Sequence, residues 1–70
     1  GLTLDFVSAA AQPINIVISD VLGRTVLQRS LELSAGQNKT HFDISELSSA
    51  VYVLTIGQGA QKIVRKITKL

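Results

Sequence analysis

The chain has 70 residues of even composition, so residues 1–70 are expected to form one small domain. It has no cysteine, which excludes disulfide bonds and thiolate metal sites. Its apolar runs are all shorter than the ~20 residues of a membrane-spanning helix. The net charge of +2 is unevenly distributed: residues 1–61 carry three basic and five acidic residues, and residues 62–70 carry four basic residues and no acid. This asymmetry is typical of an interaction segment, although lysines on a solvated edge strand give the same pattern.

Alternation of apolar and polar residues predicts strands from the beginning of the chain. The first strand is expected over residues 2–7. Small residues and the only proline, over residues 8–13, are expected to break it. A second strand over residues 14–20 places three isoleucines on one face, and a third is expected over residues 24–33.

The stretch ISDVLGRTV between the second and third strands predicts a hairpin turn. Asp20 suits the first position of a type I turn, because its carboxylate can accept a hydrogen bond from a backbone N–H two residues on. Gly23 suits the fourth position, because glycine readily adopts the left-handed conformation. A second turn is expected over residues 34–36.

The second half of the chain continues the alternating pattern. A fourth strand is expected over residues 38–44, followed by a short turn over residues 45–49, where Asp43 or Ser45 could cap a single helical turn. The most apolar strand covers residues 51–56. A turn over residues 57–60 leads into a last strand that ends at Leu70.

Six strands at this spacing predict an all-β fold, a small antiparallel immunoglobulin-like β-sandwich of six to seven strands. No segment has an apolar pattern of helical period long enough to favour a helix over these strands. The residues expected in or near the core are Leu4, Phe6, Ile16, Ile18, Val26, Phe42, Val53, Leu54 and Ile56.

The sequence offers no constellation for catalysis. His41 is the only histidine, the five carboxylates are scattered, and the glycines of residues 57–59 join two strands instead of opening a helix. No enzyme activity, cofactor or metal site is therefore expected. Nucleic acid is not expected as a partner either, because Phe6, Phe42 and Tyr52 all lie outside the basic end and cannot interleave with its cations.

Three segments together resemble a known family: DVLGRTV (residues 20–26), LSAGQNKTHFDISELSSAVYVLTI (33–56) and QKIVRKITKL (61–70). In order, they give an Asp-x-x-Gly-Arg turn, a Gly-led turn, an Asp-x-Ser-x-Leu segment, a tyrosine-containing strand and a Lys-rich final strand. This order resembles the C-terminal sorting domain of type IX secretion cargo. The matching positions are Asp20, Gly23, Arg24, Gly36, Asp43, Ser45, Leu47, Tyr52, Lys62 and Lys66. Ala50 departs from the pattern, because the family usually has glycine there.

The resemblance implies a sorting signal that directs its parent protein across the outer membrane and to cell-surface attachment. It implies transit through the periplasm, recognition by an outer-membrane translocon or shuttle and by sortase-like components, and a final location at the outer-membrane surface or outside the cell. Family members are either cleaved or retained, and both outcomes stay open here. The alternative is a non-catalytic immunoglobulin-like adhesion or assembly module of a secreted protein.

The basic end is expected to carry the part of the signal that a receptor reads. Its cations, Lys62, Arg65, Lys66 and Lys69, are expected to contact the partner. The other turn and motif positions are Asp20, Gly23, Arg24, Gly36, Asp43, Leu47 and Tyr52. Among them, Asp20, Gly23 and Gly36 would serve turn geometry in any sandwich, and Tyr52 suits a core or corner position better than a contact with a partner. Open edge strands also favour a homodimer that pairs through one of them.

Overall fold

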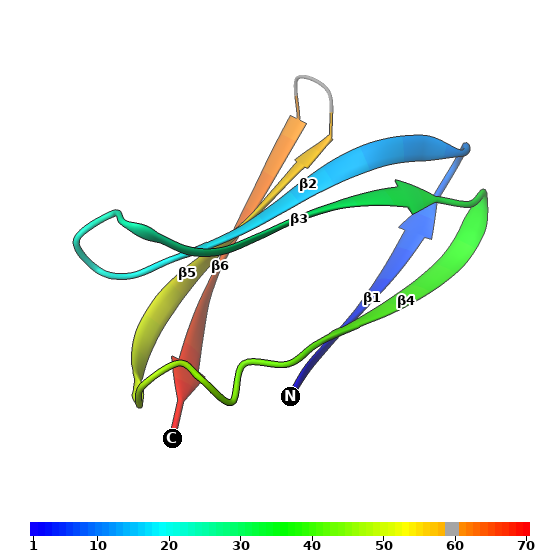
Figure 1. Cartoon of the computed structure of the whole chain (residues 1–70). Coiled ribbons are helices and arrows are strands. Elements are labelled where there is room, and N and C mark those ends of the chain that lie inside the picture. The colour runs from blue at the N-terminus through cyan, green and yellow to red at the C-terminus, as the bar shows by residue number, and fades with distance from the viewer. Residues whose placement is uncertain (59–60) are drawn as a thin grey trace.

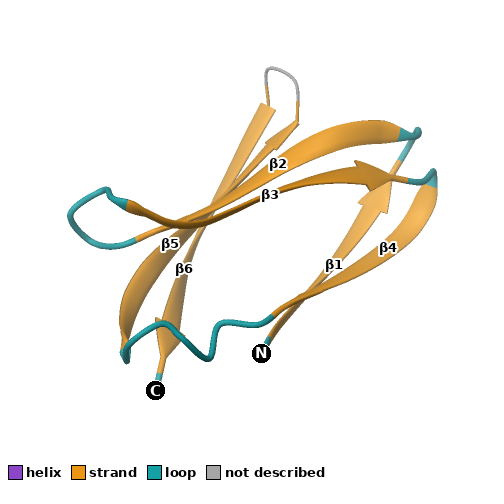
Figure 2. Cartoon of the chain, viewed as in Figure 1, coloured by secondary structure: helices purple, strands orange, loops and turns teal. Residues whose placement is uncertain are grey.

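The computed structural model describes residues 1–58 and 61–70, and this part of the chain is all β. Its six strands are β1 (Leu2–Ser8), β2 (Gln12–Ser19), β3 (Thr25–Leu33), β4 (Gly36–Phe42), β5 (Ala50–Gln58) and β6 (Gln61–Lys69) (Figure 2). Within these residues no helix is long and apolar enough to cross a membrane. The all-β prediction is confirmed.

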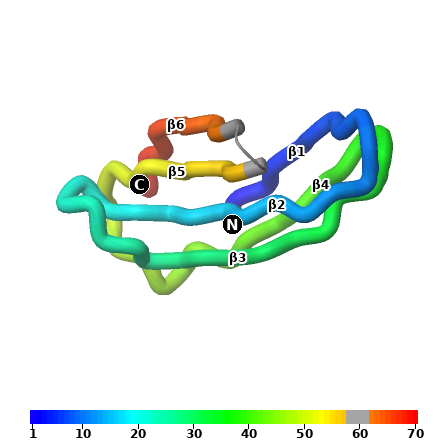
Figure 3. Tube along the Cα trace, turned by 90° about the horizontal axis from the view of Figure 1, so that it is seen from above, coloured from blue at the N-terminus to red at the C-terminus, as the bar shows by residue number. Residues whose placement is uncertain are grey.

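The strands form two antiparallel sheets, one over the other. The larger sheet has the order β3–β2–β5–β6, and the smaller sheet is the pair β1–β4 (Figure 1). Seen from above, the β1–β4 pair extends over only part of the length of β2 and β3 (Figure 3). The order of the larger sheet is that of strands C′, C, F and G of an immunoglobulin sandwich, with β1 and β4 in the places of B and E. The predicted sandwich is thus confirmed, with β3 and β6 at the edges of its larger sheet.

The expected break over residues 8–13 is wrong in part. Ser8 belongs to β1, and Gln12 and Pro13 belong to β2, so only three residues separate the strands. Pro13 pairs with β3 on one side only, because β2 does not pair with β5 before Asn15. Proline is tolerated at such a position, since no second strand needs its missing backbone N–H. The other expected strands are present with ends shifted by one to two residues. The tip of the turn expected over residues 57–60 lies outside the described residues.

The core forms where the β1–β4 pair meets the larger sheet. Partly buried side chains of β1, including Leu4 and Phe6, pack against it. Among the described residues, the buried hydrophobic residues are Ile14, Ile16, Ile18, Leu33, Phe42, Tyr52, Leu54 and Ile56, and Ile16 and Ile18 are the most completely buried. Most of the expected core is therefore confirmed, and the structure adds Ile14, Leu33 and Tyr52 to it.

Two of the expected core residues, Val26 and Val53, lie elsewhere. Val53 pairs with Ser19 and Lys66 on the outer face, because its neighbours along β5 face the core and strand side chains alternate. Val26 is 39% exposed. It lies in a bulge, because the β2–β3 register passes directly from the pair Ile18–Leu27 to the pair Ser19–Thr25 and leaves Val26 without a partner on β2.

Candidate functional site

The β2–β3 turn has the geometry that its sequence predicts. The backbone N–H of Gly23 donates to the carbonyl oxygen of Asp20 at 3.0 Å, and that of Leu22 donates to Asp20 Oδ1 at 2.9 Å. Gly23 has φ of +85°, in the left-handed region. Asp20 and Gly23 therefore occupy the first and fourth positions of this turn, as the sequence predicts for its geometry.

Arg24 completes this turn from the far side. Its backbone N–H donates to Asp20 Oδ1 at 2.9 Å, and its Nε forms a salt bridge with Asp20 Oδ2 at 2.7 Å. The backbone hydrogen bond from Arg24, helped by the guanidinium, holds the pKa of the Asp20 carboxyl below its usual value although partial desolvation opposes the shift. The three motif residues thus supply the hydrogen bonds and the left-handed backbone conformation of a single turn.

The Asp-x-Ser-x-Leu segment forms a second turn between β4 and β5. The backbone N–H of Ser45 donates to Asp43 Oδ1 at 2.9 Å, and that of Leu47 donates to the carbonyl oxygen of Ile44 at 3.0 Å. Hydrogen bonds from Ser45 lower the pKa of the Asp43 carboxyl. Leu47 packs against the core. Asp43 thus caps a turn here, and the segment does not continue into a helical turn.

Tyr52 anchors the same loop to the start of β5. Its side chain is 4% exposed, and its hydroxyl donates to the carbonyl oxygen of Ser48 at 2.7 Å. A tyrosine at the start of strand F that bonds the backbone a few residues upstream is the tyrosine corner of immunoglobulin-like folds. Tyr52 therefore has a structural role in the corner between β4 and β5.

Gly36 begins β4 with φ of +99°. The turn before it is closed by Asn38, a residue for which the sequence analysis predicted no role. The Asn38 side chain accepts from the backbone N–H of Ser34 and donates to the carbonyl oxygen of Ser34, both at 2.9 Å. An asparagine close to a turn glycine was the available signal, since its amide can replace backbone hydrogen-bond partners.

The four cations of the basic end lie on β6 but do not form one cluster. In antiparallel sheets, residues paired across two strands point to the same face. Lys62 and Lys66 pair with outer-face residues of β5. Arg65 pairs with the buried Leu54, and Lys69 lies on the same inner face as Arg65. The register therefore divides the predicted site between the two faces of the larger sheet.

Lys69 also differs from the other three cations in its contacts. Its Nζ donates to the carbonyl oxygens of Ser45 (3.2 Å) and Leu47. These bonds hold the β4–β5 loop against the end of β6. Lys62, Arg65 and Lys66 are exposed, whereas Lys69 is half-buried.

The exposed cations lie on an open strand edge. In the described part of the chain, β6 pairs with β5 alone. The only salt bridge among the described residues joins Arg24 to Asp20, so none of the exposed β6 cations has an acidic partner there. Ile63 and Val64 on the same strand are 44% and 56% exposed. This edge therefore offers positive charge, apolar side chains and unpaired backbone groups together.

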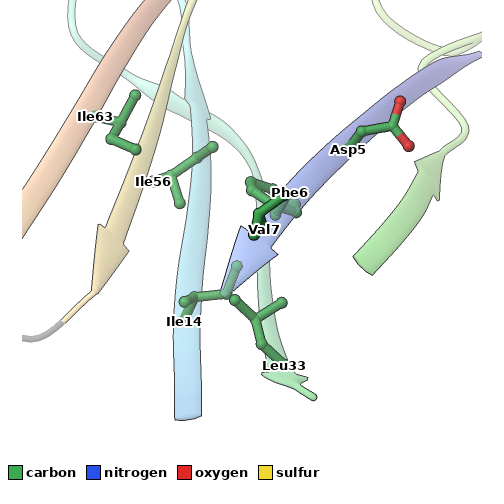
Figure 4. Close-up of a pocket in the computed structure, with 7 residues that line it drawn as sticks. All are labelled: Asp5, Phe6, Val7, Ile14, Leu33, Ile56 and Ile63. Atoms are coloured by element: carbon green, nitrogen blue, oxygen red, sulfur yellow. The ribbon is translucent and has the colours of Figure 1, made fainter. Parts of the chain in front are cut away.

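A cleft of about 240 Å³ opens beside this edge (Figure 4). Phe6 of β1 and Ile63 of β6 line it from opposite sides, and the buried Ile14 and Ile56 also line it. Within the described residues no three histidine, cysteine or acidic side chains gather to hold a metal ion. His41 instead lies with its Nδ1 2.9 Å from the Thr3 hydroxyl.

Comparison with known proteins identifies the family of the chain. A family model described as a secretion system C-terminal sorting domain matches residues 2–69, nearly the whole sequence. No curated protein and no solved structure matches. The matched region includes both motif turns, the tyrosine corner and the cations of β6. The chain therefore belongs to the family of secretion system C-terminal sorting domains, the sorting signals of type IX secretion.

Proposed function

We propose that residues 1–70 act as one sorting domain and that components of the type IX secretion system read its address on β6. The family match supports the sorting role. The open edge of β6 supports placing the recognised site on this strand. Lys62, Arg65 and Lys66 are exposed there and have no acidic partner among the described residues. Lys69 contributes by holding the β4–β5 loop.

The route that this role implies runs through the periplasm to the outer membrane. There, a shuttle or translocon component binds the domain, and sortase-like components attach the parent protein to the cell surface. The domain itself acts without catalysis or cofactor, as a recognition element. An adhesion or assembly module is not favoured, because the family match covers the chain from residue 2 to residue 69.

Positive charge on an exposed edge suits this recognition physically. Unpaired cations create a field that steers the domain toward an acidic surface and raises the encounter rate. Salt screens this field over about 10 Å at 0.1 M ionic strength, so the binding should weaken as salt is added. The motif turns at Asp20 and Asp43 satisfy their own hydrogen bonds, which leaves β6 as the stronger candidate for recognition.

The test is charge reversal on β6 within a full-length cargo protein. The double variant Lys62→Glu/Lys66→Glu should accumulate in the periplasm. The matched control Arg29→Glu/Lys39→Glu makes the same change in net charge on β3 and β4, and it should reach the surface normally. Thermal unfolding of both variants verifies that the body is folded. Normal export of the β6 variant would place the address elsewhere.

Deletion of residues 62–70 is a weaker test than charge reversal. It removes nearly all of β6 and uncovers the edge of β5, which carries the buried Tyr52 and Leu54. It also removes the Lys69 bonds to the β4–β5 loop. Periplasmic retention of a truncated cargo would therefore report a damaged body as readily as a lost address.

Self-association through an edge strand is a second proposal, and the charges favour β3 for it. Two β6 edges brought together would oppose cation to cation, whereas β3 carries one cation, Arg29, and one acid, Glu32. Sedimentation velocity on the isolated domain should show a weak dimer that Gln28→Lys/Ser30→Lys disrupts. A strictly monomeric profile at high concentration contradicts this proposal.

A further inference from the structure

The sandwich is open on the side where β1 and β6 approach each other. Within residues 1–58 and 61–70, β1 pairs only with β4 and β6 only with β5, so both strands have a free edge on this side. One cleft there is lined by Phe6 and Ile63, and a second by Leu2 and Ile67. Figure 4 shows Phe6 and Ile63 on opposite sides of the first cleft. We call this opening the β1–β6 seam, lined by Leu2, Phe6, Ile63 and Ile67.

The alternation along β6 divides its side chains between the seam and the outer face. Ile63 and Ile67 pair with the buried Ile56 and Tyr52, so both point toward the seam. Lys62 and Lys66 lie on the outer face. A strand added beside β6 would pair its free backbone groups and cover the exposed Ile63 at the same time.

A second copy of the same strand fits this edge poorly. An antiparallel β6–β6 pair centred on Val64 places Lys62 of one copy opposite Lys66 of the other. A pair centred on Arg65 places two arginines opposite each other. Like charges directly across two strands destabilise the pair, so the charge of β6 favours a partner strand of opposite sign.

We propose that β6 receives an extended strand of a partner protein, with acidic side chains opposite Lys62, Arg65 and Lys66 and apolar side chains opposite Ile63, Val64 and Ile67. The inference rests on the proposed sorting function and specifies the chemistry of the segment that reads the address. A partner strand that runs parallel to β6 needs, opposite residues 62–67 in order, an acid, two apolar residues, two acids and an apolar residue. An antiparallel partner carries the same order reversed.

The test uses the isotope-labelled 70-residue chain and two synthetic peptides, EVVEEV and its reverse VEEVVE, each flanked by serines. Amide hydrogen exchange, followed by NMR, should slow at those β6 amides that do not bond to β5 and stay unchanged on β3. A peptide with lysine in place of every glutamate should not bind. A peptide with serine in place of the valines opposite Ile63 and Ile67 should bind more weakly.

Protein variants complete the test. Lys62→Glu/Lys66→Glu turns two attractive cross-strand pairs into repulsive ones and should raise Kd by about tenfold or more. The control Arg29→Glu/Lys39→Glu should bind as the original chain does. Unchanged exchange on β6, slowed exchange on β1, β3 or β4 instead, or a dimer that itself protects the β6 edge would each overturn the inference.

The outcome is separable from that of the proposed function. If Lys62→Glu/Lys66→Glu stops export while neither peptide slows exchange on β6, strand pairing is wrong and the sorting role of β6 stands. If the peptides bind as described while the same variant is exported normally, strand pairing is supported and the address lies elsewhere.

Discussion

Replacement of Gly23 by alanine tests whether residue 23 of the β2–β3 turn requires the left-handed conformation. Gly23 has φ of +85°, and a Cβ built on it meets no atom within 4 Å. The cost of the substitution is therefore conformational, without a steric clash. A left-handed residue other than glycine costs about 1–2 kcal/mol. In a domain of this size each kcal/mol lowers Tm by about 4–8 °C.

Gly57→Ala provides a matched control, because it makes the same chemical change in a strand. Its added Cβ would lie 3.9 Å from the Asn15 carbonyl oxygen, an ordinary contact. Glycine inside a strand costs about 0.5–1 kcal/mol relative to alanine, so this variant should be as stable as the original chain or slightly more stable.

Urea unfolding followed by far-UV circular dichroism measures both variants. Gly23→Asn should recover part of the loss, because asparagine enters the left-handed region more readily than alanine does. Equal stability of Gly23→Ala and Gly57→Ala would refute the turn geometry described above.

Three further predictions concern the corner, the turn carboxylate and the loop anchor. Tyr52→Phe removes the hydroxyl that bonds the Ser48 carbonyl and should cost about 1 kcal/mol in urea unfolding, whereas a loss below about 0.3 kcal/mol would deny the corner a stabilising role. Folding lowers the pKa of the Asp20 carboxyl below its usual value of 3.8. The charged carboxylate therefore stabilises the fold at pH values above 3.8, and this stabilisation is lost as the pH falls through the folded pKa. Asp20→Asn should therefore lower Tm at neutral pH and approach the original chain in acid; a difference independent of pH would contradict this. Lys69→Ala should accelerate amide exchange in the β4–β5 loop while Lys66→Ala leaves it unchanged, and equal effects would show that Lys69 is not an anchor.

The features that the sequence predicted are those that depend on neighbours along the chain. Alternation located the six strands, because side chains on a strand point to opposite faces in turn. Asp20 and Gly23 were readable because the hydrogen bonds of the turn close within four residues. The same alternation should have separated Val53 from Leu54, since adjacent strand residues cannot both face one core.

The features that escaped prediction depend on pairing between strands. The bulge that exposes Val26 arises from the register of β2 against β3. The division of the β6 cations between two faces follows from the register of β6 against β5. The bonds from Lys69 reach residues 24 and 22 positions away along the chain. Charge counting predicted an exposed basic strand, but only the fold distinguishes its anchor from its free cations.

The most direct measurement concerns the sorting signal itself. A passenger protein that carries a periplasmic export signal is joined to the 70-residue domain and expressed in a bacterium with an intact type IX secretion system and in one that lacks the translocon. Protease accessibility on intact cells gives the surface fraction of the passenger. We expect surface exposure only in the strain with the intact system, and only with the domain attached. A passenger that stays in the periplasm of both strains, or reaches the surface of both, would contradict it.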